Sequence, residues 1–343
     1  FLTKLRDLSL EPLAVRAVRL GSAGVHAPKL DPLKQGRNSA RAVNKYRTLR
    51  DHGDGESWLD DDAAEQLPGF QNLETVDVTS GTVSSEGLRH FGRCQELKYL
   101  RLESGRHYSS VDREISAEQA ELLCEAPKLQ HLHLATYNCT DAACEALAKV
   151  GRLQSLTIGA GQLSNDGVSA LAGIAALSEL TFHIVNERPE EQLSRDDGVE
   201  RLTTLDLEDA TQLQYLEIRG GALRGPCFAP LRANARLSEI VLDGVGLDLE
   251  ACRSLITLSQ LRRLTLYRWR DDEISVDDVA DFFAGIAAMP NLEELTLPRA
   301  SLDVQLSEIL AASRSLEVVY VRKTGRRGSG REGGGEIFVE MQY

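Results

Sequence analysis

The chain has 343 residues, 27% of them charged, and its 39 Lys and Arg against 52 Asp and Glu give a formal net charge of −13 at pH 7. This acidity disfavours generic nucleic-acid binding and suits basic partners through long-range steering. The sequence has no stretch of 18 apolar residues, which excludes a transmembrane helix, and it shows no signal peptide. We therefore expect a cytoplasmic protein that binds neither nucleic acid nor membrane.

Residues 1–66 are expected to form an irregular N-terminal cap with one or two degenerate repeats. Val18 and Leu20 belong to a segment that matches the strand half of the repeat described below, and Leu49 lies in a weaker match. A basic stretch between these segments is followed by an acidic one. This charge pattern is typical of a solvated cap with internal charge pairing.

Residues 67–322 contain ten copies of the segment L-x-x-L-x-L, and their spacing is the most regular feature of the chain. The fourth residue of each copy, here called the ruler residue, is Val76, Leu100, Leu132, Leu156, Leu180, Leu216, Ile240, Leu264, Leu295 and Val319. Six of the nine spacings are 24 residues, and the other three are longer by 8, 12 and 7 residues. A fixed period with loop-sized insertions indicates a solenoid.

Each copy predicts a short strand, a tight turn, a helix and a return. Apolar and polar residues alternate from the ruler residue onward, as in a strand with one buried face. Gly81, Gly161 and Gly221 stand at the ninth position, where the chain must leave the strand sharply. The twelfth position often carries a residue typical of a helix N-cap: Ser84, Ser116, Thr140, Ser164, Ser194, Asp248, Ser275 and Asp303.

This pattern resembles the leucine-rich-repeat family in its 24-residue strand–helix form, and it is similar to bacterial GALA-type and ribonuclease-inhibitor-like repeats. The resemblance implies an α/β leucine-rich-repeat solenoid with a curved parallel sheet on the concave face and helices on the convex face. It implies no single activity, because one fold hosts many functions.

Residues 323–343 are expected to form a glycine-rich loop and an edge-capping strand. Ile337 and Val339 alternate with Phe338 and Glu340, which is typical of a strand. We expect a hairpin whose second strand covers the exposed edge of the sheet.

Neither the cysteines nor the histidines predict a metal site or a cofactor. The six cysteines lack the spacing of a disulfide framework and fall at helical or apolar positions, which indicates reduced thiols. His131 and His133 share one face of a strand, and His183 is expected two strands along, roughly 10 Å away. Metal ligands converge within about 2 Å of one point, so we expect no metal.

The search for catalytic motifs finds no P-loop, nucleophile elbow, H-E-x-x-H or dinucleotide-binding motif in the sequence. We therefore predict that the protein is not an enzyme.

The candidate binding residues lie at the third, fifth and seventh positions of each strand segment, which face away from the core. On this concave face they are Tyr99, Arg101, His131, His133, His183, Tyr215, Arg219 and Tyr267. The three enlarged repeats add loops on one rim of the sheet, with candidates His107, Tyr108, Arg188, Arg268, Trp269 and Arg270. Tyr, Trp and Arg dominate interface hot spots, whereas a plain solvated strand face is the alternative interpretation.

These observations predict a scaffold that binds a protein or peptide, and the acidic charge favours a basic partner. The alternative is the sensor region of a larger enzyme, an NTPase or ligase whose catalytic part lies upstream. The chain begins at Phe1 rather than at Met, which keeps this alternative open.

Overall fold

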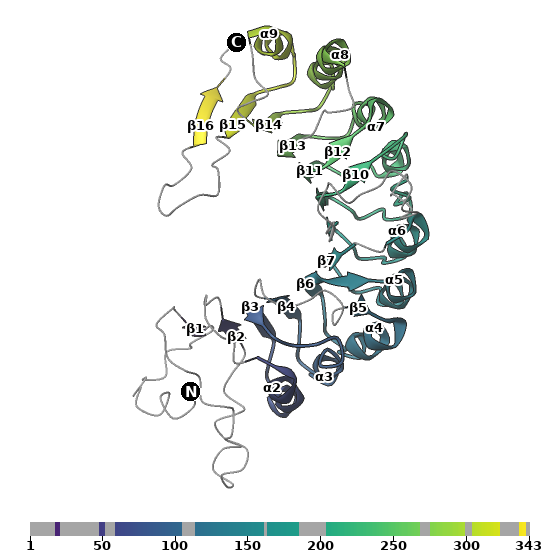
Figure 1. The fold of residues 1–343 in the computed structure, drawn as a ribbon, viewed down its shortest axis with the longest axis vertical. Helices are drawn as coiled ribbons and strands as arrows, with labels where there is room; N and C mark the ends of the chain where they lie inside the picture. Colours follow the sequence, from purple (N-terminus) through teal and green to yellow (C-terminus); the bar gives the residue numbers. More distant parts are fainter. Residues whose placement is uncertain are drawn as a thin grey trace, which may run out of the picture. The chain divides into compact units, whose positions relative to one another are not determined.

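The computed structural model describes residues 18–20, 48–51, 59–104, 114–160, 163–184, 204–267, 275–298, 304–322 and 336–340 (Figure 1). The chain forms two compact units, Phe1–Gly159 and Ala160–Tyr343.

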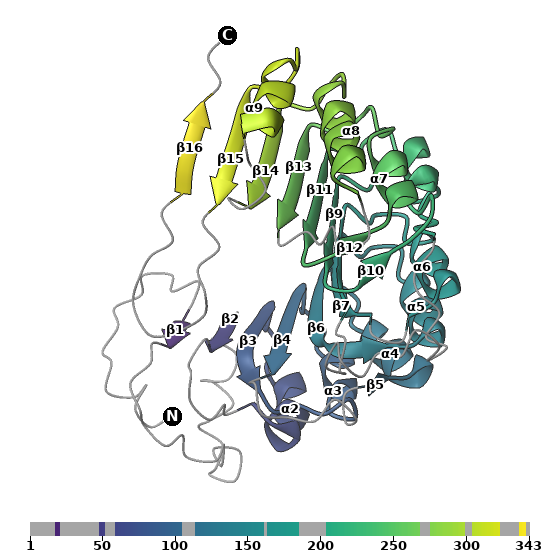
Figure 2. The same ribbon diagram turned by 45° about the horizontal axis from the view of Figure 1, so that its top comes forward.

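The first unit contains a parallel sheet built from successive repeats (Figure 1). In the order in which they pair, its strands are β1 (Val18–Leu20), β2 (Thr48–Asp51), β3 (Thr75–Gly81), β4 (Tyr99–Ser104), β6 (His131–Cys139) and β7 (Ser155–Gly159). The short strand β5 (Glu114–Ile115) pairs with the far end of β6. On one side of the sheet lie the helices α2 (Asp61–Gln66), η2 (Leu67–Gly69), α3 (Arg89–Gly92), α4 (Ala117–Cys124) and α5 (Asp141–Ala148) (Figure 2).

The second unit has the same arrangement. Its main sheet pairs β8 (Glu179–His183), β9 (Tyr215–Arg219), β11 (Glu239–Asp243), β13 (Arg263–Tyr267), β14 (Glu294–Pro298) and β15 (Val318–Arg322) in parallel. The C-terminal strand β16 (Glu336–Glu340) runs antiparallel along β15. β10 (Ala222–Leu223) and β12 (Gly246–Leu247) form a separate parallel pair. The helices are α6 (Asn165–Leu171), η5 (Ala229–Ala233), α7 (Leu249–Leu255), α8 (Val276–Ala287) and α9 (Val304–Ala311).

The ten ruler residues form the centre of the core in both units. All are buried, with exposed fractions of 3% or less. Within each unit they lie opposite one another in the strand register, as Leu216, Ile240 and Leu264 do. Because side chains alternate along a strand, this register directs all the ruler residues to the helix side of the sheet. The predicted strand–turn–helix repeat is therefore confirmed within each unit.

Most of the predicted helix N-caps are confirmed where the structure describes them. Ser116, Thr140, Ser164, Asp248 and Ser275 each accept a hydrogen bond from a backbone N–H of the first turn. Ser194 and Asp303 lie outside the described residues.

Ser84 makes the hydrogen bond of an N-cap, because its Oγ accepts the Gly87 backbone N–H at 3.3 Å. The residues that follow it form turns, and helix α3 itself begins at Arg89. The Ser84 hydroxyl also donates to Asp61 Oδ2 at 2.6 Å, and the Ser84 backbone N–H donates to Asp61 Oδ1 at 2.8 Å. A carboxylate in α2 thus holds the capping hydroxyl in place.

Side chains link consecutive repeats in the second unit where the helical segments end. The segment η5 is a 3₁₀ helix with Pro230 in its first turn, and the buried Asn234 follows it. Asn234 Nδ2 donates to the carbonyl oxygens of Leu207 and Ala210 at 2.8 and 3.2 Å. One repeat further on, Gln260 Nε2 donates to the carbonyl of Leu231 at 2.8 Å. Such bonds connect the backbone carbonyl groups of one repeat to a side chain of the next.

A longer link joins the first and third repeats of the first unit. Tyr137 in β6 is 2% exposed, and its hydroxyl donates to the carbonyl oxygen of Val83 at 2.7 Å. Strand β6 is nine residues long, and its register with β7 shifts between Leu134 and Asn138. Tyr137 lies in the extended part of β6, and its side chain reaches past the second repeat to the first.

All six cysteines are free thiols, five of them buried and Cys124 half-buried. Burial raises the pKa of Cys94, Cys227 and Cys252 to about 12. These thiols therefore stay protonated near neutral pH, and a protonated thiol is a poor nucleophile.

A Leu156→Ala change is expected to lower the free energy of unfolding by about 2–5 kcal/mol. Leu156 is 0% exposed, so the change removes its transfer free energy and leaves a cavity. Urea denaturation measures this loss. Ser155→Ala on the neighbouring, half-buried residue is the control and should cost less than about 0.5 kcal/mol. An unchanged midpoint for Leu156→Ala would contradict its place in the core.

Candidate functional site

In each unit, one face of the sheet lies opposite the helices, and we name it the open face (Figure 2). Alternation along the strands directs the third, fifth and seventh positions of the strand segments toward it, with the exceptions given below. The polar side chains on this face differ in how far they are exposed to solvent. On β9, Tyr215 is half-buried, Glu217 is 8% exposed and Arg219 is exposed. The open face is therefore where partly exposed charged and aromatic groups gather.

In the first unit, Glu103 joins two neighbouring strands of the open face. Its Oε1 accepts Nη2 and Nε of Arg101 at 2.7 and 3.1 Å. The same oxygen lies 2.7 Å from Nε2 of His133 on β6. An ionised carboxylate can only accept, so this contact requires a hydrogen on His133 Nε2. Arg101 Nε also lies 4.0 Å from Asp77 Oδ1 on β3, which extends the network to a third strand.

Hydrogen bonds keep this network charged. The bond from His133 is the largest cause that lowers the pKa of Glu103 to about 2; the bond and charge of Arg101 act in the same direction, and burial opposes them. Burial alone would lower the pKa of Arg101, but its bond to Glu103 and the charges of Glu103 and Asp77 raise it overall. Both groups are therefore ionised at neutral pH and hold one another in place.

Two aromatic rings stand beside the network. Tyr99 on β4 and His131 on β6 are opposite one another in register. Their ring centroids are 5.9 Å apart, with 39° between the ring planes. Both side chains are half-buried, so each ring offers a part of its surface to a partner.

In the second unit, Glu217 has the corresponding role on β9. Its Oε2 accepts the hydroxyl of Tyr215 at 2.8 Å, and its Oε1 accepts Nε of Arg219 at 2.6 Å. The Glu217 side chain is 10% exposed, whereas that of Arg219 is 47% exposed. Residues two apart on a strand share a face, so one buried carboxylate fixes the side chains on both sides of it.

The Tyr215 hydroxyl is held as a donor. Burial, followed by the charge of Glu217, raises the pKa of Tyr215 above its ordinary value. For Arg219, burial alone would lower the pKa, but the bond to Glu217 raises it overall. The ring and the guanidinium are thus presented in fixed orientations, which reduces the entropy lost when a partner binds.

The strand register lines up further groups across the second unit. His183, Arg219, Asp243 and Tyr267 lie side by side at the seventh positions of β8, β9, β11 and β13. At the third positions, Arg263 Nε pairs with Glu239 Oε2 at 2.8 Å. Neighbouring strands therefore carry opposite charges next to one another on the open face.

The predicted concave-face residues fall into two groups. The first unit brings together Tyr99, Arg101, His131 and His133, and the second brings together His183, Tyr215, Arg219 and Tyr267. The rim-loop candidates His107, Tyr108, Arg188, Arg268, Trp269 and Arg270 lie outside the described residues. The sequence prediction omitted Glu103 and Glu217. Their signal was an acidic residue two positions from an Arg on one strand.

The expectation that the seventh position faces away from the core is wrong at Ala135 and Gly159. Ala135 is 4% exposed. A Cβ added to Gly159 would meet the carbonyl group of Tyr137. At Gly159 the far part of the long strand β6, around Tyr137 and Asn138, leaves no room for a surface side chain.

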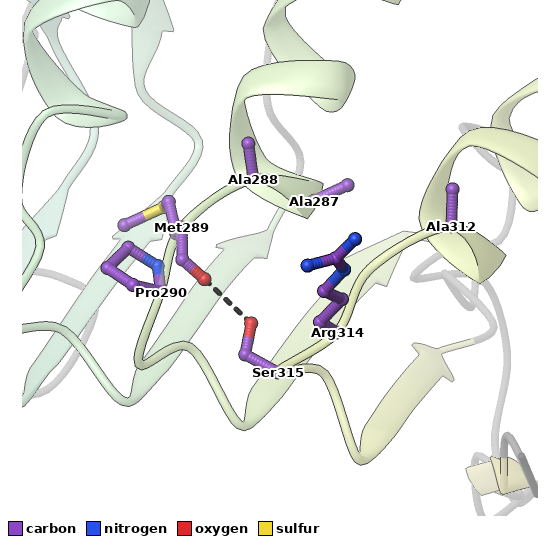
Figure 3. Close-up of a pocket in the computed structure, with 7 residues that line it drawn as sticks. All are labelled: Ala287, Ala288, Met289, Pro290, Ala312, Arg314 and Ser315. Carbon is purple, nitrogen blue, oxygen red and sulfur yellow. Dashed lines mark hydrogen bonds between the residues drawn. The ribbon is translucent and has the colours of Figure 1, made fainter.

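A hollow of about 420 Å³ lies between the ends of helices α8 and α9 (Figure 3). Its lining consists of Ala287, Ala288, Met289, Pro290, Ala312, Arg314 and Ser315. Across it, the Ser315 hydroxyl donates to the carbonyl oxygen of Met289 at 2.6 Å. The hollow is a gap between two successive returns of the repeat, and Arg314 is the charged group in its lining.

The residues that the structure describes contain no group of three or more His, Cys, Asp or Glu able to hold a metal ion. Over the same ranges, every helix is too short or too polar to cross a bilayer.

The 24-residue period, the parallel register and the helices on one side of the sheet define an α/β leucine-rich-repeat solenoid in each unit. Among solved structures, the chain is similar to an internalin, InlF of Listeria monocytogenes, with 14% identity, a TM-score of 0.40, and coverage of 81% of this chain and 88% of that one. It is also similar to TLR13 in a TLR13–ssRNA13 complex, with 17% identity, a TM-score of 0.46, and coverage of 76% of this chain and 38% of that one. No protein-family model and no curated protein matches the sequence.

A Glu103→Gln change is expected to reduce stability in a pH-dependent way. The folded pKa of about 2 lies below the ordinary 4.5, so the carboxylate stabilises the fold above about pH 4.5, and this contribution is lost as the pH falls toward 2. The variant should lose about 1–3 kcal/mol at neutral pH and progressively less below pH 4.5.

Urea denaturation of both proteins between pH 7 and pH 3 measures this difference. Glu121→Gln, which removes an exposed carboxylate from α4, controls for the loss of one negative charge. A difference between wild type and Glu103→Gln that stays constant with pH would contradict the role given to Glu103.

Proposed function

We propose that the protein is a scaffold that binds a protein or peptide partner on the open face of its sheet. The observation that carries this proposal is the cluster around Glu217, where a buried carboxylate holds a half-buried Tyr215 and an exposed Arg219 in fixed positions. Tyr and Arg dominate binding hot spots. Fixed orientation favours binding further, because less side-chain entropy is lost.

The cluster in the first unit supports the same role. Arg101 is 33% exposed and His133 25% exposed, and both are bonded to Glu103. Tyr99 and His131 add partly exposed rings beside them. Each unit thus offers aromatic and cationic groups supported by an acid, and we propose that all eight concave-face residues contact the partner.

The rim loops are the second part of the proposed site. They carry His107, Tyr108, Arg188, Arg268, Trp269 and Arg270. Repeat insertions on one face of a solenoid often form its binding face, and long loops on a rigid scaffold commonly carry recognition.

A basic partner fits the charge of this surface best. On strands β8 to β14 of the second unit, the acidic open-face residues are Glu179, Glu217, Glu239, Asp243 and Glu294, and the basic ones are Arg219 and Arg263. Both arginines are already paired with glutamates. The remaining negative charge attracts cations and repels the phosphates of a nucleic acid.

We propose no catalytic role for the chain itself. The pKa of Glu103, about 2, lies far from neutrality, and a general acid or base works best with a pKa near the operating pH. The free cysteines also support a reducing, cytoplasmic location. In the alternative, where the chain is the recognition region of a larger NTPase or ligase, the open face would bind in the same way.

The test is selection of binders from a displayed random-peptide library, followed by affinity measurements on variants. Tyr99→Ala combined with Tyr267→Ala should weaken binding by more than about 30-fold, or 2 kcal/mol, while the thermal melt stays unchanged. Glu121→Ala and Glu145→Ala, on exposed positions of α4 and α5, are the controls. If the selected peptides no longer bind the helix variants but still bind the tyrosine double variant, the proposal is refuted.

A further inference from the structure

The third positions on the open face of the second unit place carboxylates at a regular interval. Glu179 on β8, Glu239 on β11 and Glu294 on β14 are each two strands apart. Adjacent strands lie about 4.8 Å from one another, so the carboxylates recur at about 10 Å across the sheet. Glu179 is exposed, and Glu239 and Glu294 are half-buried.

An aromatic ring separates the first two carboxylates. Tyr215 lies opposite both Glu179 and Glu239 in the strand register. Its hydroxyl is tied to Glu217 at 2.8 Å, which fixes the far end of the ring. A fixed aromatic surface between acidic groups suits a segment rich in proline, because proline rings pack on aromatic side chains without a large entropy loss.

Arg263 separates the second and third carboxylates. Its Nε pairs with Glu239 Oε2 at 2.8 Å, and its side chain is 52% exposed. This ion pair involves Oε2 of Glu239, so Oε1 can accept a hydrogen bond from a donor of the partner. Arg263 also repels a cation that approaches this part of the row, so its removal should strengthen the binding of a basic partner.

The interval of about 10 Å selects the conformation of that partner. Side chains on one side of an extended strand recur at about 6.6 Å, every second residue. A polyproline II helix has 3 residues per turn and rises about 3.1 Å per residue, so its side chains recur on one side at about 9 Å. An α-helix reaches a similar interval only at every second turn, about 10.5 Å for seven residues.

We propose that the open face of the second unit, from β8 to β14, binds a basic polyproline II segment with Lys or Arg at every third residue. The basic side chains pair with Glu179, Glu239 and Glu294, and the residues between the first two pack on Tyr215. This inference rests on the proposed function, to which it adds the conformation and the charge spacing of the partner.

The test measures fluorescence anisotropy of labelled peptides with the full chain at low salt. The matched peptide is K-P-P-K-P-P-K-P-P. A second peptide has the same composition with lysines at alternate positions, K-P-K-P-K-P-P-P-P. A third is an alanine-rich helical peptide with lysines seven residues apart. The matched peptide should bind about fivefold more tightly than either of the others, as expected for one or two additional ion pairs.

Variants connect this preference to the row of carboxylates. Glu179→Gln with Glu294→Gln should abolish the preference, and Arg263→Gln should tighten binding of the matched peptide. Glu250→Gln with Glu308→Gln removes the same charge from exposed positions of α7 and α9, and should leave the preference intact.

Three results would overturn the inference. They are equal affinity for the two proline peptides, an equal loss of the preference in the two double variants, and tighter binding of the helical peptide than of the matched peptide. These results leave the proposed function separately testable. Suppose that the selected peptides no longer bind when Tyr99 and Tyr267 are changed, but that lysine spacing has no effect on the affinity of the proline peptides. The scaffold role then stands, and the polyproline II inference fails.

Discussion

A single strand–helix repeat cannot bury its apolar face alone, so every repeat in this protein depends on pairing in register with its neighbours. Leu216 is buried because Leu180 and Ile240 lie on either side of it in adjacent strands. A slip of one residue would turn each ruler residue to the opposite face of the sheet. The packing of the core therefore also determines which polar side chains become neighbours on the open face, and the candidate site is a consequence of the leucine spacing.

Stable presentation of these polar groups depends on carboxylates that are buried, as Glu217 is, or half-buried, as Glu103 is. Removing a charge from water is costly unless it is paired and hydrogen-bonded. Glu217 meets this requirement with two donors on its own strand, and Glu103 meets it with Arg101 and His133 from two strands. The same arrangement makes the surface sensitive to substitution, because loss of a donor leaves a buried charge without compensation.

The core and most helix starts could be predicted from the sequence because their signals are local and repeated. The ruler residues recur at a fixed period, and a cap such as Ser116 is recognised from the three residues that follow it. Ser84 has the same local signal and accepts the Gly87 N–H, but the turns after it become a helix only at Arg89. Its hydroxyl and its backbone N–H also donate to Asp61 of the preceding repeat. A contact with a residue 23 positions away in the chain cannot be recognised from a local pattern.

The candidate site could be predicted in position but not in pairing. Residue alternation correctly placed Arg101 on the open face, with two acidic side chains near it. The side-chain conformation decides between them: Arg101 Nη2 lies 2.7 Å from Glu103 Oε1, whereas Nε lies 4.0 Å from Asp77 Oδ1. At Ala135 and Gly159 the alternation rule failed: Ala135 is buried, and the far part of the long strand β6 covers Gly159, which a regular repeat would leave open.

The hydrogen bond between Tyr137 and Val83 has a consequence for how this chain can change by duplication or loss of repeats. The bond joins the third repeat to the first. Excision of the second repeat would leave every remaining strand with an acceptable neighbour, yet it would move this donor away from its acceptor inside the core. Recombination should therefore preserve the segment from β3 to β6 as one block, whereas repeats joined only to their immediate neighbours can be copied or lost singly.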